Sequence, residues 1–147
     1  MALRFGIIGT GYFGTHYIRL LQEIEGALLV GVAARTREEL VALPDSFKKY
    51  ANADDLLRDA DIDCVVIATP ASTHARLAIS ALENNKHVLL EKPMAVSLEE
   101  ARAIADAAKK SNRICMIGHQ YCYNDYIRYL KKELEKNTIG NIKFLVA

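Results

Sequence analysis

Three glycines near the start of the sequence have the spacing of a dinucleotide-binding turn. They lie in the stretch Gly9-Thr10-Gly11-Tyr12-Phe13-Gly14. In such a turn the first glycine permits a tight bend, the second lets backbone N–H groups approach a pyrophosphate, and the third allows a helix to pack closely on a strand. The positive end of the following helix also attracts the diphosphate. The spacing predicts that these six residues bind the pyrophosphate of NAD or NADP.

The end of the second apolar run indicates which dinucleotide to expect. NAD-binding domains usually carry an acid about 20 residues after the turn, where it hydrogen-bonds the ribose 2′-OH. This sequence has Ala34-Arg35-Thr36-Arg37 there, without an acid. Two arginines with a hydroxyl between them could hold a 2′-phosphate through charge-assisted hydrogen bonds. We therefore expect NADP(H) to be favoured over NAD(H).

A second interpretation of this segment stays open. Arg35 and Arg37 would be surface cations next to the acids Glu38 and Glu39. Thr36 would then be the N-cap of a short helix. In this interpretation the arginines contribute nothing to the choice of cofactor.

The elements that must position these residues alternate along the chain. Short apolar runs, too apolar to have one face in water, are separated by amphipathic stretches, which is typical of parallel strands joined by crossover helices. The runs are Leu3–Ile8, Leu28–Ala34, Cys64–Ala68, His87–Leu90 and Ile114–Ile117, with a weaker one at Phe47–Tyr50. The sequence thus predicts an α/β fold with a doubly wound, mostly parallel sheet of the Rossmann type.

Two later helices have distinct sequence signals. Ser97 is a candidate N-cap, and Glu100 follows it at capping-box spacing. For the next helix we expect one inward-facing stripe, formed by Tyr123, Ile127, Leu130 and Leu134.

Composition narrows the class of protein. The 147 residues carry 19 basic and 18 acidic side chains, a net charge of +1, which argues against a nucleic-acid partner. No apolar run has membrane-spanning length. The N-terminal residues also lack the apolar stretch of a signal peptide, so we expect a cytoplasmic protein. The cysteines Cys64, Cys115 and Cys122 are odd in number and lack metal-ligand spacing, so we expect no disulfide or metal site.

Two further stretches are specific enough to indicate a family. They are Ala68-Thr69-Pro70-Ala71-Ser72-Thr73-His74 and Ala81-Leu82-Glu83-Asn84-Asn85-Lys86-His87-Val88-Leu89-Leu90-Glu91-Lys92-Pro93-Met94-Ala95. With them the chain resembles, from Leu3 to its last residue, the Gfo/Idh/MocA family of NAD(P)-dependent oxidoreductases. The Glu-Lys-Pro signature also argues against a methyltransferase that uses the glycine turn for S-adenosylmethionine.

The resemblance implies roles for residues at matching positions. Lys92 matches the family's lysine that lies beside the nicotinamide and the substrate and positions the reacting hydroxyl. Lys92 is therefore the candidate catalytic residue. Its ammonium could stabilise a developing alkoxide. Glu91 would lie beside the cofactor, and Pro93 would impose a fixed turn, for which a cis peptide bond is one form. Thr69, Pro70 and His74 match a loop that runs along the cofactor, with His74 cofactor-adjacent rather than catalytic.

One more segment resembles the family near the end of the last predicted strand. It is Gly118-His119-Gln120-Tyr121-Cys122-Tyr123-Asn124, similar to the family's Gly-His-x-x-Arg-Phe-Asn. Its side chains would face the pocket, with Gln120 at the cofactor. Cys122 stands where an arginine is common, which puts a contact from that arginine in doubt.

The resemblance also predicts the organisation of the chain. Residues 1–122 would form the NAD(P)-binding Rossmann domain, and residues 123–147 a connecting helix and the first strand, Ile142–Val146, of a second α/β domain that is absent. We expect such a chain to bind cofactor but to turn over no sugar or polyol, and its open strand to invite pairing of copies into a homo-oligomer.

Two functions remain from this sequence. The first is the cofactor-binding part of an oxidoreductase that transfers a hydride between a nicotinamide cofactor and a sugar or polyol hydroxyl or its ketone. The second is a non-catalytic dinucleotide-binding or scaffold module, because a fold does not by itself determine a function.

Overall fold

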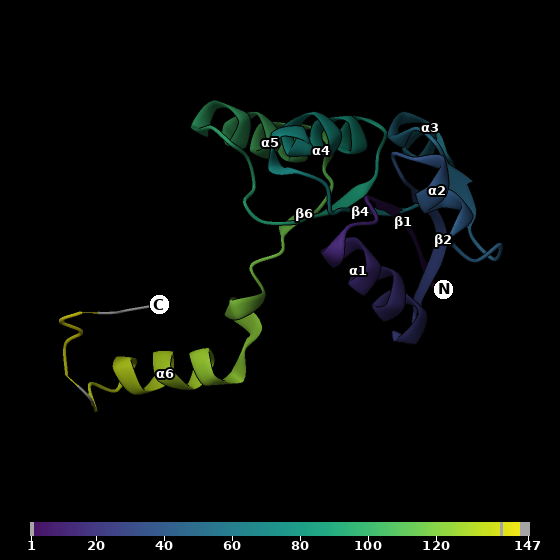
Figure 1. The fold of residues 1–147 in the computed structure, drawn as a ribbon. Helices are drawn as coiled ribbons and strands as arrows, with labels where there is room; N and C mark the ends of the chain where they lie inside the picture. Colours follow the sequence, from purple (N-terminus) through teal and green to yellow (C-terminus); the bar gives the residue numbers. More distant parts are fainter. Residues whose placement is uncertain (1, 139, 145–147) are drawn as a thin grey trace.

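The computed structural model describes residues 2–138 and 140–144 and contains a six-stranded parallel sheet (Figure 1). The strands are β1 (Leu3–Ile8), β2 (Ala27–Ala33), β3 (Lys48–Tyr50), β4 (Cys64–Ile67), β5 (His87–Leu90) and β6 (Cys115–Ile117). Their order is β3-β2-β1-β4-β5-β6. The predicted doubly wound Rossmann fold is confirmed, and the chain reverses its direction of winding between β1 and β4.

Helices cover both faces of this sheet (Figure 1). They are α1 (Tyr12–Glu23), α2 (Arg37–Val41), α3 (Ala53–Arg58), α4 (His74–Glu83), α5 (Leu98–Ser111) and α6 (Asp125–Glu135), with 3-10 turns η1 (Ala71–Thr73) and η2 (Gln120–Tyr123). In β4 the side chains alternate between two cores: Val65 and Ile67 pack with α3, α4 and α5, and Val66 packs with Leu21 of α1. Burial on both faces explains why the strands are continuous apolar runs.

The cap of α5 confirms one predicted feature and modifies another. The Ser97 hydroxyl accepts a hydrogen bond from the Glu100 N–H at 3.2 Å, so Ser97 is the N-cap. The Glu100 carboxylate does not return to the Ser97 N–H as a capping box requires; it accepts from the N–H of Val96, also at 3.2 Å.

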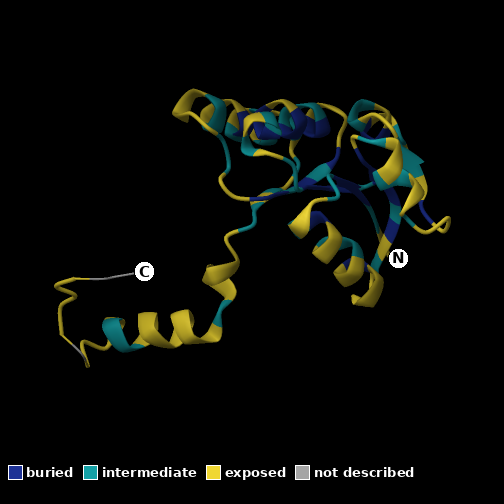
Figure 2. Ribbon diagram, in the orientation of Figure 1, coloured by how far each residue is buried: buried dark blue, intermediate teal, exposed yellow. Residues whose placement is uncertain are grey.

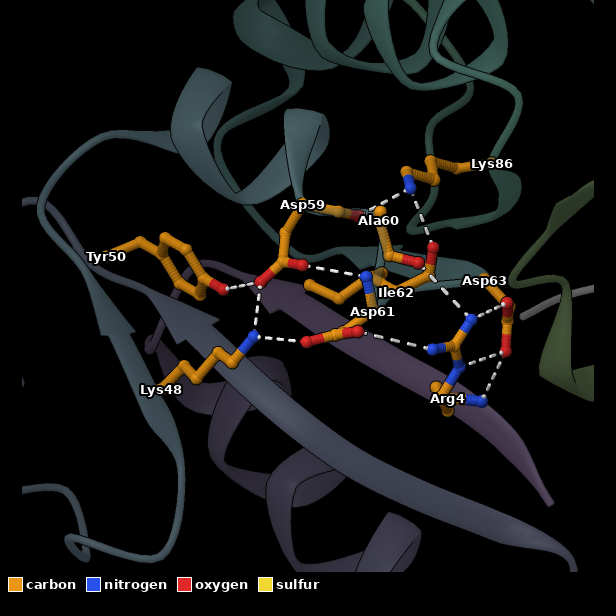
Figure 3. Close-up of polar contacts among 9 residues, drawn as sticks. All are labelled: Arg4, Lys48, Tyr50, Asp59, Ala60, Asp61, Ile62, Asp63 and Lys86. Atoms are coloured by element: carbon orange, nitrogen blue, oxygen red, sulfur yellow. Dashed lines mark hydrogen bonds and ion pairs between the residues drawn. The ribbon is translucent and has the colours of Figure 1, made fainter.

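A polar cluster fixes the loop that leads into β4 (Figure 3). Arg4 binds both oxygens of Asp63, at 2.7 and 2.9 Å, and Lys86, which is 7% exposed, donates to the carbonyls of Asp59 and Ile62 at 2.6 and 2.7 Å. Lys48 binds Asp59 at 2.8 Å. These contacts lie at the amino ends of β1 and β4, at the edge of the sheet opposite the glycine turn.

The helix α6 extends away from the sheet and its helices (Figures 1 and 2). The expected inward-facing stripe is wrong here: Tyr123, Ile127 and Leu130 are exposed and Leu134 is half-buried. The reason is that α6 lies away from the sheet and the helices that cover it, so the described residues place no core against this side of α6 (Figure 1).

The predicted terminal strand is not formed in the described part of that segment. Residues 142–144 have no strand structure, and the remaining residues of that prediction, 145 and 146, lie outside the described residues. A strand requires a neighbour to pair with its backbone, and the part of the chain described here offers none beside residues 142–144. Pairing of copies through this segment stays a prediction.

Candidate cofactor site

A cavity of about 700 Å³ opens at the carboxyl ends of β1, β2 and β4, where the sheet changes its winding direction. In open α/β sheets this is the place where ligands bind. The lining residues come from the glycine turn, the ends of β2 and β3, and the segment after β4. They are Ile8, Gly9, Thr10, Gly11, Ala33, Ala34, Arg35, Glu39, Ala51, Asn52, Ala53, Ala68, Thr69, Pro70, Thr73, Arg76 and Leu77.

The three glycines of the turn differ in how much space a side chain would have. Gly9 has φ of +102°, and a Cβ on Gly14 would lie 2.1 Å from the Gly9 carbonyl oxygen, so both positions require glycine for the turn itself. Around Gly11, in contrast, a Cβ would meet no atom within 4 Å. The chain therefore does not need a glycine at position 11 for its own packing.

The helix that follows the turn begins without a side-chain cap. Gly11 is the N-cap of α1 and makes no side-chain hydrogen bond to the N–H groups of the first turn. Those groups and the helix dipole form an anion site, and the open space at Gly11 gives a diphosphate access to it. The residues present thus fit the pyrophosphate of a dinucleotide.

The segment after β2 separates the two arginines that were expected to act together. Arg35 lines the cavity, whereas Arg37 lines a shallow depression with Val41 on the outside of α2. Thr36 caps α2: its hydroxyl accepts from the Glu39 N–H at 3.3 Å in a full capping box. The interpretation of Thr36 as a cap is confirmed. Arg37 is the first residue of the helix that Thr36 caps and does not line the cavity, and a joint contact of both arginines with one phosphate stays a prediction.

The capping box brings a carboxylate to the cavity that the sequence analysis missed. Glu39 lines the cavity, and its carboxylate accepts from the N–H groups of Arg35 and Thr36, each at 3.1 Å. These hydrogen bonds, the one from Thr36 first, lower the pKa of Glu39. The acid expected for an NAD-binding domain would lie at the end of β2, whereas Glu39 belongs to α2. Its capping-box spacing from Thr36 was the one signal in the sequence for its position.

The loop after β4 is tied to the Glu-Lys-Pro loop through His74. The His74 side chain is 1% exposed, with Nδ1 2.8 Å from the Pro93 carbonyl oxygen and Nε2 2.9 Å from the Thr69 carbonyl oxygen. His74 therefore lies beneath the cavity wall formed by Thr69 and Pro70 and does not line the cavity. Its ring connects two loops at the carboxyl edge of the sheet.

The Glu-Lys-Pro loop lies beside the glycine turn. Glu91 is 7% exposed; its Oε1 accepts from the Tyr17 hydroxyl at 2.6 Å and its Oε2 from the Lys92 N–H at 3.1 Å. Burial, together with the hydrogen bond to Glu91, raises the pKa of Tyr17. The Lys92 Nζ lies 5.4 Å from the centroid of the Phe13 ring, and the Lys92–Pro93 peptide bond is cis.

Several predicted site residues lie outside the cavity itself. Besides Thr36, Arg37 and His74, they are Tyr12, Phe13, Gly14, Glu91, Lys92 and Gln120. Tyr12 is 75% exposed, Gln120 is exposed in η2, and Phe13 and Lys92 contact each other beside the turn. The assignment of these residues to cofactor or substrate stays a prediction.

Apart from Glu39, one wall of the cavity could not be read from the sequence; it is formed by residues 51–53 after β3 and by the end of η1 and the start of α4. It consists of Ala51, Asn52, Ala53, Thr73, Arg76 and Leu77. Residues 51–53 follow the short strand β3, so their position after a strand end was the available signal. Arg76, paired with Asp54 at 3.2 Å, had no such signal, because its place depends on how α3 and α4 pack.

The described residues hold neither a metal-ligand group nor a membrane-spanning helix. Residues 2–138 and 140–144 contain no group of three or more His, Cys, Asp or Glu side chains that could hold a metal ion. Over the same residues no helix has both the length and the apolar character needed to cross a bilayer.

Comparison with known proteins identifies relatives of the chain. Residues 3–119 match the sequence model of the Gfo/Idh/MocA oxidoreductase family, described as an NAD-binding Rossmann fold. The chain is 36% identical over 141 residues to glucose-6-phosphate 3-dehydrogenase of Bacillus subtilis, covering 95% of this chain and 40% of that protein. It is 30% identical over 140 residues to 2,7-anhydro-N-acetylneuraminate hydratase of Escherichia coli, covering 95% and 38%.

A solved structure shares the fold over nearly the whole chain. The crystal structure of scyllo-inositol dehydrogenase from Lactobacillus casei with bound NAD(H) and scyllo-inositol has a TM-score of 0.89 and 27% identity, covering 97% of this chain and 43% of that one. The chain spans about 40% of the length of the curated relatives it matches.

Proposed function

The chain belongs to the Gfo/Idh/MocA oxidoreductase family, and we propose that it forms the cofactor-binding part of an enzyme that transfers a hydride between a nicotinamide dinucleotide and a sugar or polyol. The observation that carries this proposal is the cavity at the switch point of the sheet, with an uncapped helix end and open space at Gly11. The names of matched relatives, a sugar-phosphate dehydrogenase and an inositol dehydrogenase, support the substrate class.

Different residues of the cavity would bind different parts of the dinucleotide. The N–H groups at the start of α1 would bind the pyrophosphate, and Gly11 would let it approach. Arg35, which follows the end of β2, would contact the ribose that carries the 2′ substituent. Thr69 and Pro70 would line the path toward the Glu-Lys-Pro loop. A bound nicotinamide ring supplies the hydride chemistry, which no side chain of this protein can supply alone.

Lys92 is the proposed catalytic residue. Its side chain is exposed beside the glycine turn, where a substrate hydroxyl could lie against it. An ammonium there would hold the hydroxyl oxygen by hydrogen bonding and stabilise negative charge on it as the proton leaves. Glu91 would act on Lys92 only through the backbone, since its Oε2 accepts from the Lys92 N–H.

We further propose that NADP(H) binds more tightly than NAD(H), and that Arg35 alone provides this preference. The guanidinium of Arg35 lies at the cavity, but the Glu39 carboxylate lies there too and repels a 2′-phosphate. The preference is therefore expected to be small, about fivefold or less, as for an exposed ion pair.

Two substitutions test the proposed preference. Arg35→Ala should lower the ratio of NADPH to NADH affinity, and Glu39→Gln should raise it; Arg37→Ala, outside the cavity, is the matched control. Tighter binding of NADH by the unmodified protein, or an unchanged ratio in Arg35→Ala, would refute the proposal.

Residues 123–147 are proposed to lead from the Rossmann domain of residues 1–122 into a second domain. The support is the exposed apolar side of α6, with Ile127 46% and Tyr126 84% exposed, together with the share of the relatives' length that the chain spans. We also propose a cytoplasmic location, for which the free thiols of Cys64, Cys115 and Cys122 are the support.

Titration of the chain with NADH and NADPH, followed by cofactor fluorescence, tests the proposed cofactor site. Gly11→Val should abolish saturable binding, because its side chain fills the approach to the helix end, where an added Cβ meets no atom of the protein within 4 Å. Equal affinity in Gly11→Val and the unmodified chain would contradict the site. A non-catalytic binding module would pass this test, so it is distinguished by turnover of a family-length protein and the loss of that turnover in Lys92→Ala.

A further inference from the structure

Two side chains of α1 contact two successive residues of the Glu-Lys-Pro loop. Phe13 and Tyr17 are four residues apart and therefore lie on one face of the helix. The ring of Phe13 lies under the Lys92 ammonium at 5.4 Å, and the hydroxyl of Tyr17 donates to Glu91 at 2.6 Å. The helix that begins at the glycine turn thus touches the loop at both residues.

The Tyr17 contact fixes the backbone of Lys92 through Glu91. The Glu91 carboxylate is 7% exposed, and a buried carboxylate must be held by donors. Tyr17 supplies the donor for Oε1, and the Lys92 N–H supplies one for Oε2. On the β6 side, a Cβ added to Gly118 would lie 3.3 Å from Oε1, so a side chain at this position would crowd the carboxylate.

The Phe13 contact acts on the other end of the same lysine. A cation over an aromatic face is attracted to the ring's negative quadrupole. The ring is itself placed by its neighbours: the Tyr12 ring meets it edge-on, with centroids 5.3 Å apart, and His16 packs on Tyr12 at 4.7 Å. A lysine carries its ammonium on a flexible four-carbon stem, so this contact restricts positions that the ammonium could otherwise reach.

We propose that Phe13 and Tyr17 are positioning residues for Lys92: Tyr17 fixes the lysine backbone through Glu91, and Phe13 holds the ammonium. The helix whose amino end would receive the pyrophosphate then also sets the place of the lysine that would meet the substrate. The use of this arrangement in catalysis rests on the proposed function; the positioning itself does not.

The test is carbon-13 NMR of the 147-residue chain after reductive methylation of its lysines with ¹³C-formaldehyde, which leaves the ammonium charge in place. The Lys92 signal is assigned by its loss in Lys92→Arg. We expect a signal shifted upfield by the Phe13 ring current. The shift should be lost in Phe13→Leu and retained in Phe13→Tyr. Tyr17→Phe should reduce it although Tyr17 does not touch the ammonium, whereas Tyr126→Phe, an exposed tyrosine on α6, should leave it unchanged.

Either half of the proposal can be overturned. An unshifted Lys92 signal, or one that Phe13→Leu leaves in place, removes the role of Phe13; equal spectra for Tyr17→Phe and Tyr126→Phe remove that of Tyr17. If Tyr17→Phe does not fold, Glu91→Gln is used instead, because a glutamine is a weaker acceptor for Tyr17 and should also reduce the Lys92 shift. An unchanged Lys92 signal in Glu91→Gln contradicts the proposal. The spectra are recorded without cofactor, so their outcome is independent of whether the cofactor titration succeeds.

Discussion

At the scale of single residues, the glycine turn separates positions needed for folding from a position available to a ligand. Gly14→Ala should destabilise the chain by roughly 1–3 kcal/mol or more, since its Cβ would overlap the Gly9 carbonyl oxygen at 2.1 Å. Gly11→Ala meets no atom within 4 Å and should change the free energy of unfolding much less. Urea unfolding of the two variants measures the difference, and equal midpoints would contradict this division of roles.

His74 gives a second residue-level prediction. Its buried ring lies 2.8 and 2.9 Å from two carbonyl oxygens, so His74→Ala should leave these groups without their partner and cost about 1–3 kcal/mol. Because the ring links the loops of Thr69 and Pro93, the variant should also weaken NADPH binding. Thermal unfolding and cofactor titration report the two effects, and a fully stable variant with unchanged affinity would show that the link is not needed.

The residues that the sequence predicted well are those whose role is local. The glycine turn depends on neighbouring backbone atoms, so its spacing alone located it at the cavity. The place of Arg37 outside the cavity lining could not be predicted from spacing alone, because it depends on the helix that Thr36 starts. Arg76 was missed because it reaches the cavity only through the packing of α3 against α4.

At the scale of elements, the polar cluster before β4 predicts how stability depends on pH. The hydrogen bonds from Arg4 lower the pKa of Asp63 to about 2, below the value of about 3.9 for an unfolded chain. A folded-state pKa that is lowered contributes stability in full above about pH 4, and this contribution is lost as the pH falls toward 2.

Asp63→Asn isolates this contribution. The unmodified chain should have the higher melting temperature at pH 6, and the difference between the two proteins should shrink steadily between about pH 4 and pH 2. Thermal unfolding followed by circular dichroism over this range measures it. A difference independent of pH would mean that the Arg4–Asp63 pair adds no charge-dependent stability.

The strands could be predicted because burial on both faces leaves a continuous apolar run in the sequence. The run Phe47–Tyr50 gives a weaker signal because two lysines interrupt it, and within it Lys48–Tyr50 form the strand. The stripe of α6 was recognised as amphipathic, but periodicity identifies a face without identifying what covers it. In the described structure that face is exposed (Figure 2).

At the scale of the whole molecule, the cavity and Lys92 are neighbours but do not form one enclosed site. The residues that line the cavity do not include Lys92, whose side chain is exposed. Hydride transfer needs a substrate carbon held at about 3.5 Å, and such positioning supplies roughly 7–11 kcal/mol of the barrier. We therefore expect the 147-residue chain to bind cofactor without turning over sugars, inositols or their ketones. Absorbance at 340 nm measures this, and turnover that Lys92→Ala abolishes would contradict it.

Binding of a nicotinamide dinucleotide in the cavity at the carboxyl edge of the sheet is measured by mapping amide chemical shifts during titration with NADPH. We expect saturable changes that are largest at Gly11, Phe13, Gly14, Arg35 and Thr69, with the opposite edge at Arg4 and Asp63 unaffected. Changes centred on that opposite edge or on α6, or no saturable change at all, would contradict it.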